Sequence, residues 1–473
     1  MALRCPVAVQ PCPPRAQVSG APARLLKRAC HANYVFSLAA PLWVYSRTLR
    51  WKRRAANVHL AAVGKPATTD RPSEHTPDEI RANFTLMSVL FALNHGVVTT
   101  PLAVATTLLQ TDVANFGNGL LYAVTLLSSL FLGAPTVSKF GPKGGLAVGM
   151  LFYCIYIGCF ALALTFSNDT QVLFSLGSAC GGIAAGVLWT AQGAYFSSSA
   201  TMLAASAEQS REETTAELSS QFAFYYLLLE VFSKLSFSAL QALGVQVWLI
   251  GLIFFVAGTA SLLGMTQVYD FRTSTEPQPL SKALAAVSLW SDPAIWLLAP
   301  TNLTFGFCAA YMNGFVNGRY ASQELGSEYV AFLGAITALT AAILAKAYGP
   351  LGAQVGKGPI IVAGAACAFA IPALTWQGCT GWGWLLLSLY LLQGSFRAVY
   401  ESTNRATFSD FFPGEKSEGA FANCMLQSSL GFAACFFLQN SLSATELSTI
   451  VLTLALSTPL GYGLASSLRS KDG

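Results

Sequence analysis

The sequence predicts an all-α protein that crosses a membrane many times. Twelve apolar stretches, most of them about twenty residues long, lie between Asn83 and Ser467 and are separated by short polar connectors. A helix needs roughly 20 mainly apolar residues to cross a bilayer, and the hydrocarbon forces each crossing to satisfy its own backbone hydrogen bonds. The composition agrees, because 53% of the residues are hydrophobic and only 10% are charged, whereas soluble domains carry about 25% charged residues.

The first 80 residues form a basic segment that precedes the helices. Residues 1–69 contain eleven of the 27 Lys and Arg residues and no acidic residue, so the remainder has 16 basic and 22 acidic residues and a net charge of −6. An acid-free, Arg-rich leader is typical of an organelle transit peptide. A disordered cytosolic tail that follows the positive-inside rule fits equally well, so both interpretations stay open.

The apolar stretches divide into two sets of six. The first set is 83–108, 117–136, 144–166, 172–196, 221–241 and 247–268. The second set is 293–317, 328–348, 358–376, 382–404, 418–439 and 446–467. We therefore predict an N-terminal six-helix bundle at 81–268, a central polar loop at 269–292 and a C-terminal six-helix bundle at 293–468.

A loop motif repeats in the two halves. It consists of Gly141, Pro142 and Lys143 after the second stretch, and of Gly349, Pro350 and Lys357 after the eighth. Lys143 and Lys357 are 214 positions apart, which is about the length of one six-helix set. A repeat of this length, split by a polar linker, is typical of a transporter built from two pseudo-symmetric bundles.

The basic residues predict the orientation of the chain. If the N-terminus lies inside, the inner connectors and the C-terminus carry eleven Lys or Arg residues, and the outer connectors carry only Arg319. This imbalance predicts that both termini lie on the cytosolic side. The membrane is an organelle membrane, such as that of a plastid, if the leader is a transit peptide, and otherwise a plasma membrane or endomembrane. Asn168 begins a glycosylation sequon in a predicted outer loop.

Two pairs of opposite charges lie inside apolar stretches. Arg397 and Glu401 in the tenth stretch, and Glu230 and Lys234 in the fifth, are each four residues apart and therefore share a helix face. Because a charge at the bilayer centre costs at least about 2.5 kcal/mol, such residues face a partner or a wet cavity. Each pair is either part of a transport site or a structural lock between helices.

Several uncharged polar residues are further candidates for a central cavity. The fourth stretch places Trp189 and Gln192 on one side of a helix, where an interfacial aromatic belt is the competing interpretation. Asn94 and His95 lie in the first stretch, and His95 either carries protons or simply bonds a neighbouring helix. The remaining candidates are Asn302 and Asn313 in the seventh stretch and Gln393 in the tenth.

The sequence lacks the patterns of several other protein classes. It contains no nucleophile elbow, no HExxH zinc motif and no complete Walker loop, so we predict neither enzymatic activity nor ATP hydrolysis. Seven of the eleven cysteines lie in apolar stretches without metal-ligand spacing, which argues against a disulfide framework or a metal site. We expect no cofactor and no nucleic-acid partner.

Three segments resemble the uncoordinated-93-like family of the major facilitator superfamily. The fourth stretch contains Gly181-Gly-Ile-Ala-Ala-Gly-Val-Leu-Trp-Thr-Ala-Gln-Gly-Ala-Tyr195, which is similar to the hallmark motif of that family. Phe140-Gly-Pro-Lys143 resembles its loop after the second helix, and Glu418-Gly-Ala-Phe421, followed by Gln427-Ser-Ser, resembles its eleventh helix. The resemblance covers about residues 83–467.

The resemblance implies a major-facilitator-type fold with twelve transmembrane helices, in which helices one, four, seven and ten line a central cavity. It places the following candidates near the central axis: Asn94, His95, Trp189, Gln192, Asn302, Asn313, Gln393, Arg397 and Glu401. It also implies a role as an ion-channel regulatory protein, since animal members are known as subunits or trafficking partners of other membrane proteins. The tenth helix departs from the animal pattern, which is more neutral where this chain has Arg397 and Glu401.

Two functions follow from these observations. The first is secondary or facilitated transport of a small solute or ion by alternating access through a central polar cavity. The second is a non-transporting regulator or trafficking partner of an ion channel or another membrane protein, in which the charge pairs are structural. Both place the chain in a lipid bilayer.

Overall fold

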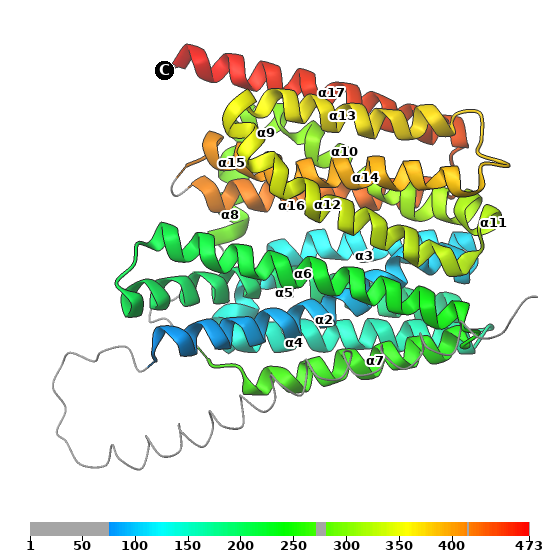
Figure 1. Ribbon diagram of the computed structural model, residues 1–473, viewed down its shortest axis with the longest axis horizontal. Helices are drawn as coiled ribbons and strands as arrows, with labels where there is room; N and C mark the ends of the chain where they lie inside the picture. Colours follow the sequence, from blue (N-terminus) through cyan, green and yellow to red (C-terminus); the bar gives the residue numbers. More distant parts are fainter. Residues whose placement is uncertain (1–74, 271–280, 414–415, 473) are drawn as a thin grey trace, which may run out of the picture. The chain divides into compact units, whose positions relative to one another are not determined.

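A computed structural model describes residues 75–270, 281–413 and 416–472 (Figure 1). The predicted basic segment up to residue 74 and residues 271–280 of the predicted central loop therefore lie outside the described residues. Within them the secondary structure is helical, with no strand in the described part of the chain. The all-α prediction is confirmed.

The first half contains six long helices that match the first six predicted stretches. They are α2 (Pro77–Leu108), α3 (Thr111–Phe131), α4 (Gly133–Thr165), α5 (Thr170–Ala207), α6 (Arg211–Ala242) and α7 (Val247–Gly264), which ends in the 3₁₀ turn η1 (Met265–Gln267). Helices α5 and α6 extend well past the predicted ends. Their ends are set by local capping rather than by bilayer thickness, since Glu208 takes a left-handed conformation after α5 and Ser210 forms a capping box with Glu213 before α6.

The second half contains more breaks. It comprises α8 (Ser281–Ser288), η2 (Leu289–Ser291), α9 (Pro293–Leu297), α10 (Ala299–Ala310), η3 (Tyr311–Ala321), α11 (Ser322–Glu324), α12 (Ser327–Val355), α13 (Lys357–Thr375), η4 (Gly383–Leu386), α14 (Leu387–Val399), η5 (Tyr400–Asn404), α15 (Arg405–Phe411), α16 (Lys416–Leu438) and α17 (Ala444–Asp472). The break before α10 comes just ahead of Pro300, as the missing backbone donor predicts. The seventh and tenth predicted stretches each contain a π-helical segment, η3 and η5.

The helix contacts repeat with an offset of one six-helix set. In the first half α2 packs on α6, α3 and α4 pack on α5, and α4 packs on α7. In the second half the equivalent contacts are these: α10 packs on α16, both α12 and α13 pack on α14, and α13 packs on α17. The main contacts between the halves are also related by this symmetry, since α6 packs on α12 and α3 on α16. The two pseudo-symmetric six-helix bundles predicted from the sequence are confirmed as packing units, although the exact residue boundaries of the domains stay a prediction.

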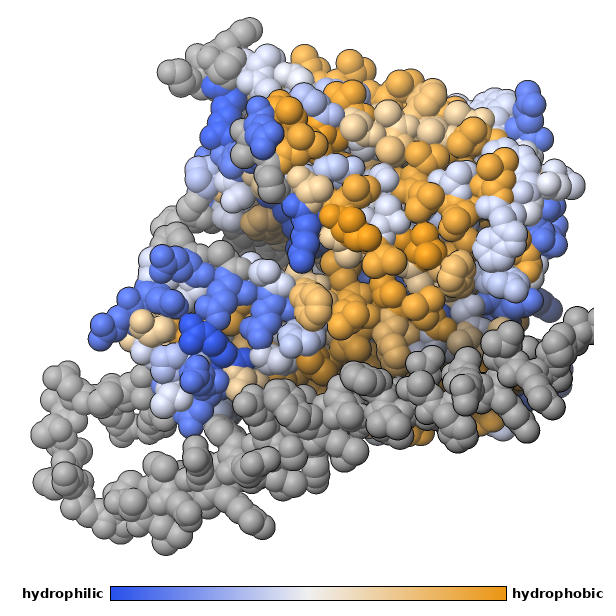
Figure 2. Space-filling model, viewed as in Figure 1, coloured by the Kyte–Doolittle hydropathy of each residue, from blue (hydrophilic) through white to orange (hydrophobic). Residues whose placement is uncertain are grey.

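The outer surface of the helices matches a lipid environment. Eleven helices in the described part of the chain are long and apolar enough to cross a membrane. The remaining passage, the tenth in chain order, covers residues 383–411. It is divided by η5 and carries four charged residues, but it packs beside α12 and α13 like the other passages. Figure 2 shows apolar residues across the middle of one face and hydrophilic residues at both helix ends. The prediction of a multi-span membrane protein is confirmed.

Two glycines of α5, Gly182 and Gly186, form part of a packing surface. Gly182 and Gly186 on α5 face α3, where Ser128 donates a hydrogen bond to the Gly182 carbonyl at 2.7 Å. A Cβ atom at Gly186 would collide with the Ser128 hydroxyl and with the backbone nitrogen of Ser129. Such close approach of helix backbones is the usual role of small residues in membranes.

Gly186→Ala should therefore destabilise the protein by about 1–3 kcal/mol, which is typical of overpacking a close contact. Gly193→Ala on the same helix is the matched control, because a Cβ atom there has nothing within 4 Å. The measurement is thermal unfolding of the two purified variants in detergent. Equal unfolding temperatures for both variants would contradict the packing role of Gly186.

One loop prediction needs correction. Gly349 and Pro350 were expected in a loop after the eighth stretch, but α12 continues past them to Val355. The turn falls instead at Gly356, with φ 83° and ψ 167°, and matches the turn at Gly141, with φ 74° and ψ 170°. Both turns need the positive φ that glycine adopts without strain, and this requirement places the helix end.

Candidate functional site

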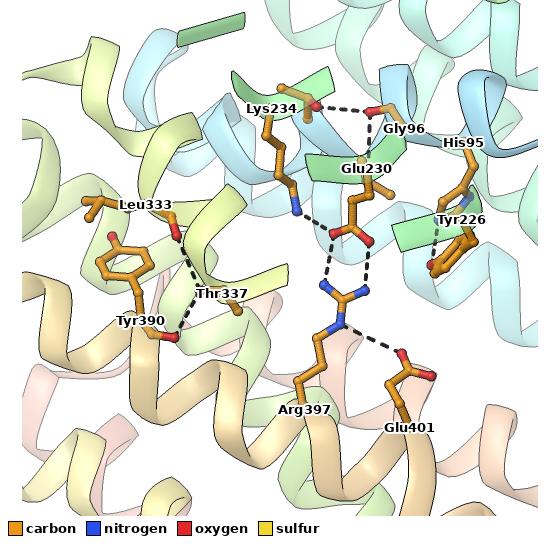
Figure 3. A network of polar contacts seen from close by, with 12 residues as sticks. His95, Gly96, Tyr226, Glu230, Lys234, Leu333, Thr337, Tyr390, Arg397 and Glu401 are labelled. Carbon is orange, nitrogen blue, oxygen red and sulfur yellow. Dashed lines mark hydrogen bonds and ion pairs between the residues drawn. The ribbon is translucent and has the colours of Figure 1, made fainter. Parts of the chain in front are cut away.

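Glu230 and Arg397 join the two halves of the protein in the middle of the helices. Glu230 lies on α6 and Arg397 on α14, and both guanidinium Nη atoms donate hydrogen bonds to the carboxylate, each at 2.8 Å (Figure 3). The Glu230 residue is only 2% exposed and the Arg397 side chain 14%. Two parallel charge-assisted bonds of this kind are among the strongest polar contacts in proteins.

Lys234 binds the same carboxylate from one turn further along α6. Its Nζ atom donates to Glu230 Oε1 at 2.5 Å, and the residue is buried. The stem of Lys234 passes Gly334 on α12, where a Cβ atom would lie 3.6 Å from Lys234 Cδ. Lys234 therefore also lies where the two halves meet.

Glu401 and Arg405 extend this network along the tenth passage. The Arg397 Nε atom lies 3.8 Å from Glu401 Oε1, and Arg405 Nη2 lies 3.0 Å from Glu401 Oε2. Side-chain exposure rises from 3% at Glu230 to 27% at Glu401 and 53% at Arg405. We call the five residues, Lys234, Glu230, Arg397, Glu401 and Arg405, the charge ladder. The two pairs predicted from the sequence are thus parts of one network.

The buried charges of the ladder each need at least one opposite charge beside them. A buried ion pair gains little over apolar packing, but removal of one partner typically costs about 3–5 kcal/mol because the other charge stays buried and unpaired. Glu230 lies between two cations and Arg397 between two anions, so each has an opposite charge on both sides. With three cations and two anions, the ladder carries a formal charge of +1.

The π-helical turn η5 separates two parts of the ladder. Arg397 precedes it on α14, Glu401 lies within it, and Arg405 begins α15. A π turn shifts the angular position of every later residue on a helix and often occurs at functional sites. Here Arg397 faces α6, whereas Arg405, two turns later, is more than half exposed.

His95 lies in an aromatic cluster beside the ladder. Its Nε2 atom is 3.2 Å from the Tyr226 hydroxyl, and its ring centroid is 5.2 to 6.0 Å from those of four neighbouring rings. We call His95 with Phe91, Tyr153, Trp189, Phe222 and Tyr226 the His95 cluster. Tyr226 and Glu230 are one turn apart on α6, so the cluster adjoins the ladder (Figure 3). His95 Nδ1 is buried and has no hydrogen-bond partner in the described residues.

Asn302 lies in a separate polar network within the second half. Its Nδ2 atom donates to Gln427 Oε1 at 2.7 Å, and its Oδ1 atom accepts from Asn404 Nδ2 at 2.8 Å. Gln427 Nε2 reaches the Ile295 carbonyl, which the break before α10 leaves without a helical partner. These three buried side chains connect the seventh, tenth and eleventh passages.

The other predicted candidates are spread through the bundle. Asn94 points to α7, where it donates to the Gly258 carbonyl at 3.2 Å. Gln393 is buried and accepts from the Cys308 thiol at 3.2 Å, while Gln192 is half-buried on α5. The Asn313 carbonyl accepts from Thr106 at one end of the helices. Of the nine candidates, His95, Trp189, Arg397 and Glu401 are the ones brought together around the ladder.

Several hydrogen bonds join the halves at the end of the helices that carries the α2–α3 and α11–α12 connections. We call this the outer end, after the predicted orientation, and the opposite end the inner end. Asn115 on α3 donates to Asn440 at 3.1 Å, Asn317 on η3 donates to the Ala103 carbonyl at 2.9 Å, and Gln241 donates to Ser327 at 2.8 Å. The outer end is therefore closed by polar contacts between the halves.

At the inner end several polar contacts each lie within one half. Lys143 donates to the Thr266 carbonyl at 3.1 Å in the first half, and Arg81 pairs with Glu217 at 2.7 Å. Lys357 donates to the Ala406 carbonyl at 3.0 Å in the second half and also pairs with Asp410. The repeated loop lysines thus play equivalent roles in the two halves, each tying its loop to another passage.

Other features of the described residues lie away from the ladder. A surface cavity of about 510 Å³ lies near the outer end of α13, lined by residues that include Phe369, Trp376 and Trp382. None of the predicted site residues lines it. The eight described cysteines are free, and no group of three or more His, Cys, Asp or Glu side chains in the described part of the chain is placed to hold a metal. Asn168 is exposed between α4 and α5.

The sequence contains signals for further residues of this site. Arg405 follows Glu401 by four residues, so the same spacing rule that paired Arg397 with Glu401 extends to it. Tyr226 precedes Glu230 by four residues and shares its face. The bond between Glu230 and Arg397 joins residues 167 positions apart, and helix periodicity carries no information on such a contact.

The sequence of the chain was compared with known families and proteins. No protein-family model matches the chain. It is 26% identical to protein unc-93 homolog A of Mus musculus over 401 residues, which cover 74% of this chain and 85% of that protein. This confirms the family resemblance seen in the sequence motifs.

The fold is similar to that of solved transporters. The nucleoside transporter NupG aligns with a TM-score of 0.61 at 14% identity, covering 82% of this chain and 98% of that one. A D-xylose–proton symporter aligns with a TM-score of 0.61 at 14% identity, covering 80% and 95%. The major-facilitator fold is thereby confirmed. These relatives are membrane proteins and not enzymes, which agrees with the non-enzymatic prediction.

Proposed function

We propose that the chain, a multi-span membrane protein with the major-facilitator fold and similar in sequence to protein unc-93 homolog A, moves a small solute across the membrane by alternating access. The supporting observation is the charge ladder, which joins the two halves at Glu230 and Arg397 in the middle of the helices. Charged residues at this depth usually mark a substrate or ion pathway.

The distribution of polar contacts supports an inward-facing state. The contacts between the halves gather at the outer end and at the ladder, while Arg405, the last residue of the ladder towards the inner end, is more than half exposed. In alternating access the two halves rock about a central site. The outer contacts then break, and the ladder rearranges as the halves move.

The test is uptake into proteoliposomes that contain the purified full chain. The solute panel contains uridine and D-xylose, after the two structural relatives, together with benzoate, a cationic amine and rubidium. We expect at least one solute to enter above the level of empty vesicles, and Arg397→Ala to lose most of that flux because the halves lose their central contact. Amounts of folded protein are matched by size-exclusion chromatography.

A panel in which no solute moves, although the protein is folded, would contradict transport. It would favour the non-transporting regulator, in which the ladder is a structural clasp. The two functions also predict different effects of Arg397→Ala. A transporter loses flux, whereas a regulator keeps its partner binding as long as the bundle stays folded.

The orientation and location of the protein are part of the same proposal. We place both termini on the cytosolic side, because the predicted inner connectors carry almost all the basic residues of the connectors. Fluorescent fusions with and without residues 1–80 test the leader. If residues 1–80 are a transit peptide, their removal should shift the protein from an organelle to another membrane, and an unchanged location would exclude this role.

A further inference from the structure

The charge ladder and the His95 cluster together select a class of solute, and this inference rests on the proposed transport site. The buried part of the ladder, Lys234, Glu230 and Arg397, contains two cations and one anion. Glu401 and Arg405, the more exposed members, add one charge of each sign. The excess of one positive charge therefore belongs to the buried end of the ladder, where little water screens it.

Lys234 is the source of this excess. The carboxylate of Glu230 accepts two bonds from Arg397, and Lys234 shares its Oε1 atom. An ammonium group has three donors, and the bond to Glu230 is the one hydrogen bond of Lys234 in the described part of the chain. The residue is only 6% exposed. A buried cation with donors to spare is a ready binding partner for an anion.

Arg397 offers a second contact for an anion. Its guanidinium group already holds a carboxylate in the bidentate geometry that arginine prefers for carboxylates. The Arg397 Nε atom lies 3.8 Å from Glu401 Oε1, which is longer than its bonds to Glu230. This contact is on the side of Arg397 that leads to the more exposed residues of the ladder. In this state the carboxylates of Glu230 and Glu401 contact Arg397. The acidic group of a solute would bind Arg397 beside these carboxylates or in place of one of them.

The His95 cluster supplies an apolar, ring-binding surface next to these cations. Trp189 and Tyr226 lie edge to face, with centroids 5.6 Å apart, and Phe222 stacks on Tyr226 at 5.9 Å. His95 Nδ1 is a buried polar atom with no partner in the described residues, so it offers a hydrogen bond to a bound molecule. Aromatic side chains favour stacked or edge contacts with planar rings.

We propose that the solute is a small organic anion with a planar ring, held at its acidic group by Lys234 and Arg397 and at its ring by the His95 cluster. Binding of one such anion neutralises the excess charge of the ladder. A neutral solute leaves that charge uncompensated, and a cation adds to it.

Equilibrium binding of radiolabelled benzoate to the detergent-solubilised full chain tests this directly. Benzamide has the same ring without the charge, and acetate has the charge without the ring. We expect both competitors to bind about tenfold to hundredfold more weakly than benzoate, since hydrogen bonds to charged groups and ring burial are each worth that much. Equal competition by benzamide would overturn the role of charge, equal competition by acetate would overturn the role of the ring, and no binding of benzoate would overturn both.

Lys234→Met is the most informative variant, because it removes the excess charge and leaves the bond between Glu230 and Arg397 in place. We expect benzoate binding to weaken by about tenfold or more, without loss of folded protein. Lys346→Met, at an exposed lysine on α12, is the matched control and should bind like the unmodified protein. Trp189→Ala should weaken benzoate binding but not that of acetate, which tests the ring site in a protein that keeps all its charges.

Binding and transport can fail separately. Benzoate binding without flux of any solute would sustain the solute class and contradict transport. Flux of uridine or D-xylose in a protein that does not bind benzoate would sustain transport and contradict the solute class.

Discussion

Glu230→Gln should destabilise the protein more than any other single change in the charge ladder. The substitution keeps the size of the side chain but leaves Lys234 and Arg397 next to each other without the carboxylate that both contact. Breaking a buried pair in this way typically costs about 3–5 kcal/mol. Reversible unfolding by denaturant in mixed micelles measures the change in free energy of unfolding.

Glu401→Gln is the matched control for this prediction. It makes the same chemical change one step along the ladder, but Glu401 is 27% exposed and its partner Arg405 is 53% exposed. Exposed ion pairs contribute about 0.2–1 kcal/mol, so the loss should be much smaller. Equal losses for the two variants would show that burial does not determine the importance of Glu230.

A covalent link between the halves at the outer end should abolish transport. Asn115 and Asn440 are hydrogen-bonded at 3.1 Å and lie on different halves. In a protein with Asn115→Cys and Asn440→Cys, a short thiol-reactive cross-linker should hold the outer end closed and stop the flux, and reduction should restore it. Alternating access requires this end to open in every cycle. Flux is measured in proteoliposomes before and after cross-linking.

A cross-link within one half controls for the chemistry. Tyr329 and Trp384 both belong to the second half and have ring centroids 5.2 Å apart. Linking cysteines at these two positions should leave the flux largely unchanged. Continued flux after complete cross-linking between positions 115 and 440 would mean that the outer contacts do not separate during transport.

The helical passages could be predicted well because their cause is local. Hydropathy alone predicts all twelve helical passages. It predicts the tenth passage even though Arg397, Glu401 and Arg405 lower the apolar character of that segment. The i, i+4 spacing correctly paired Glu230 with Lys234, because a helix fixes the distance between such residues. The loop repeat also placed Lys143 and Lys357 at corresponding positions, and in the structure each lysine donates to a carbonyl within its own half.

The rest of the site depends on the packing of distant segments. Nothing in the spacing of Glu230 and Arg397 indicates that they meet, since their contact depends on how α6 and α14 face each other across the halves. Hydropathy places Asn94 in the membrane but does not say that it faces α7 rather than the centre. The π turn at Tyr400–Asn404 likewise has no simple sequence pattern, although it separates Arg397 from Arg405.

A double-mutant cycle across Glu230 and Arg397 tests the central contact most directly. The two single alanine variants and the double variant are unfolded reversibly in mixed micelles, and the coupling energy is calculated from their stabilities. We predict a coupling of at least about 1.5 kcal/mol, in the range measured for close, desolvated charge pairs. If the two substitutions add within about 0.5 kcal/mol, as independent sites do, the two residues do not hold the halves together.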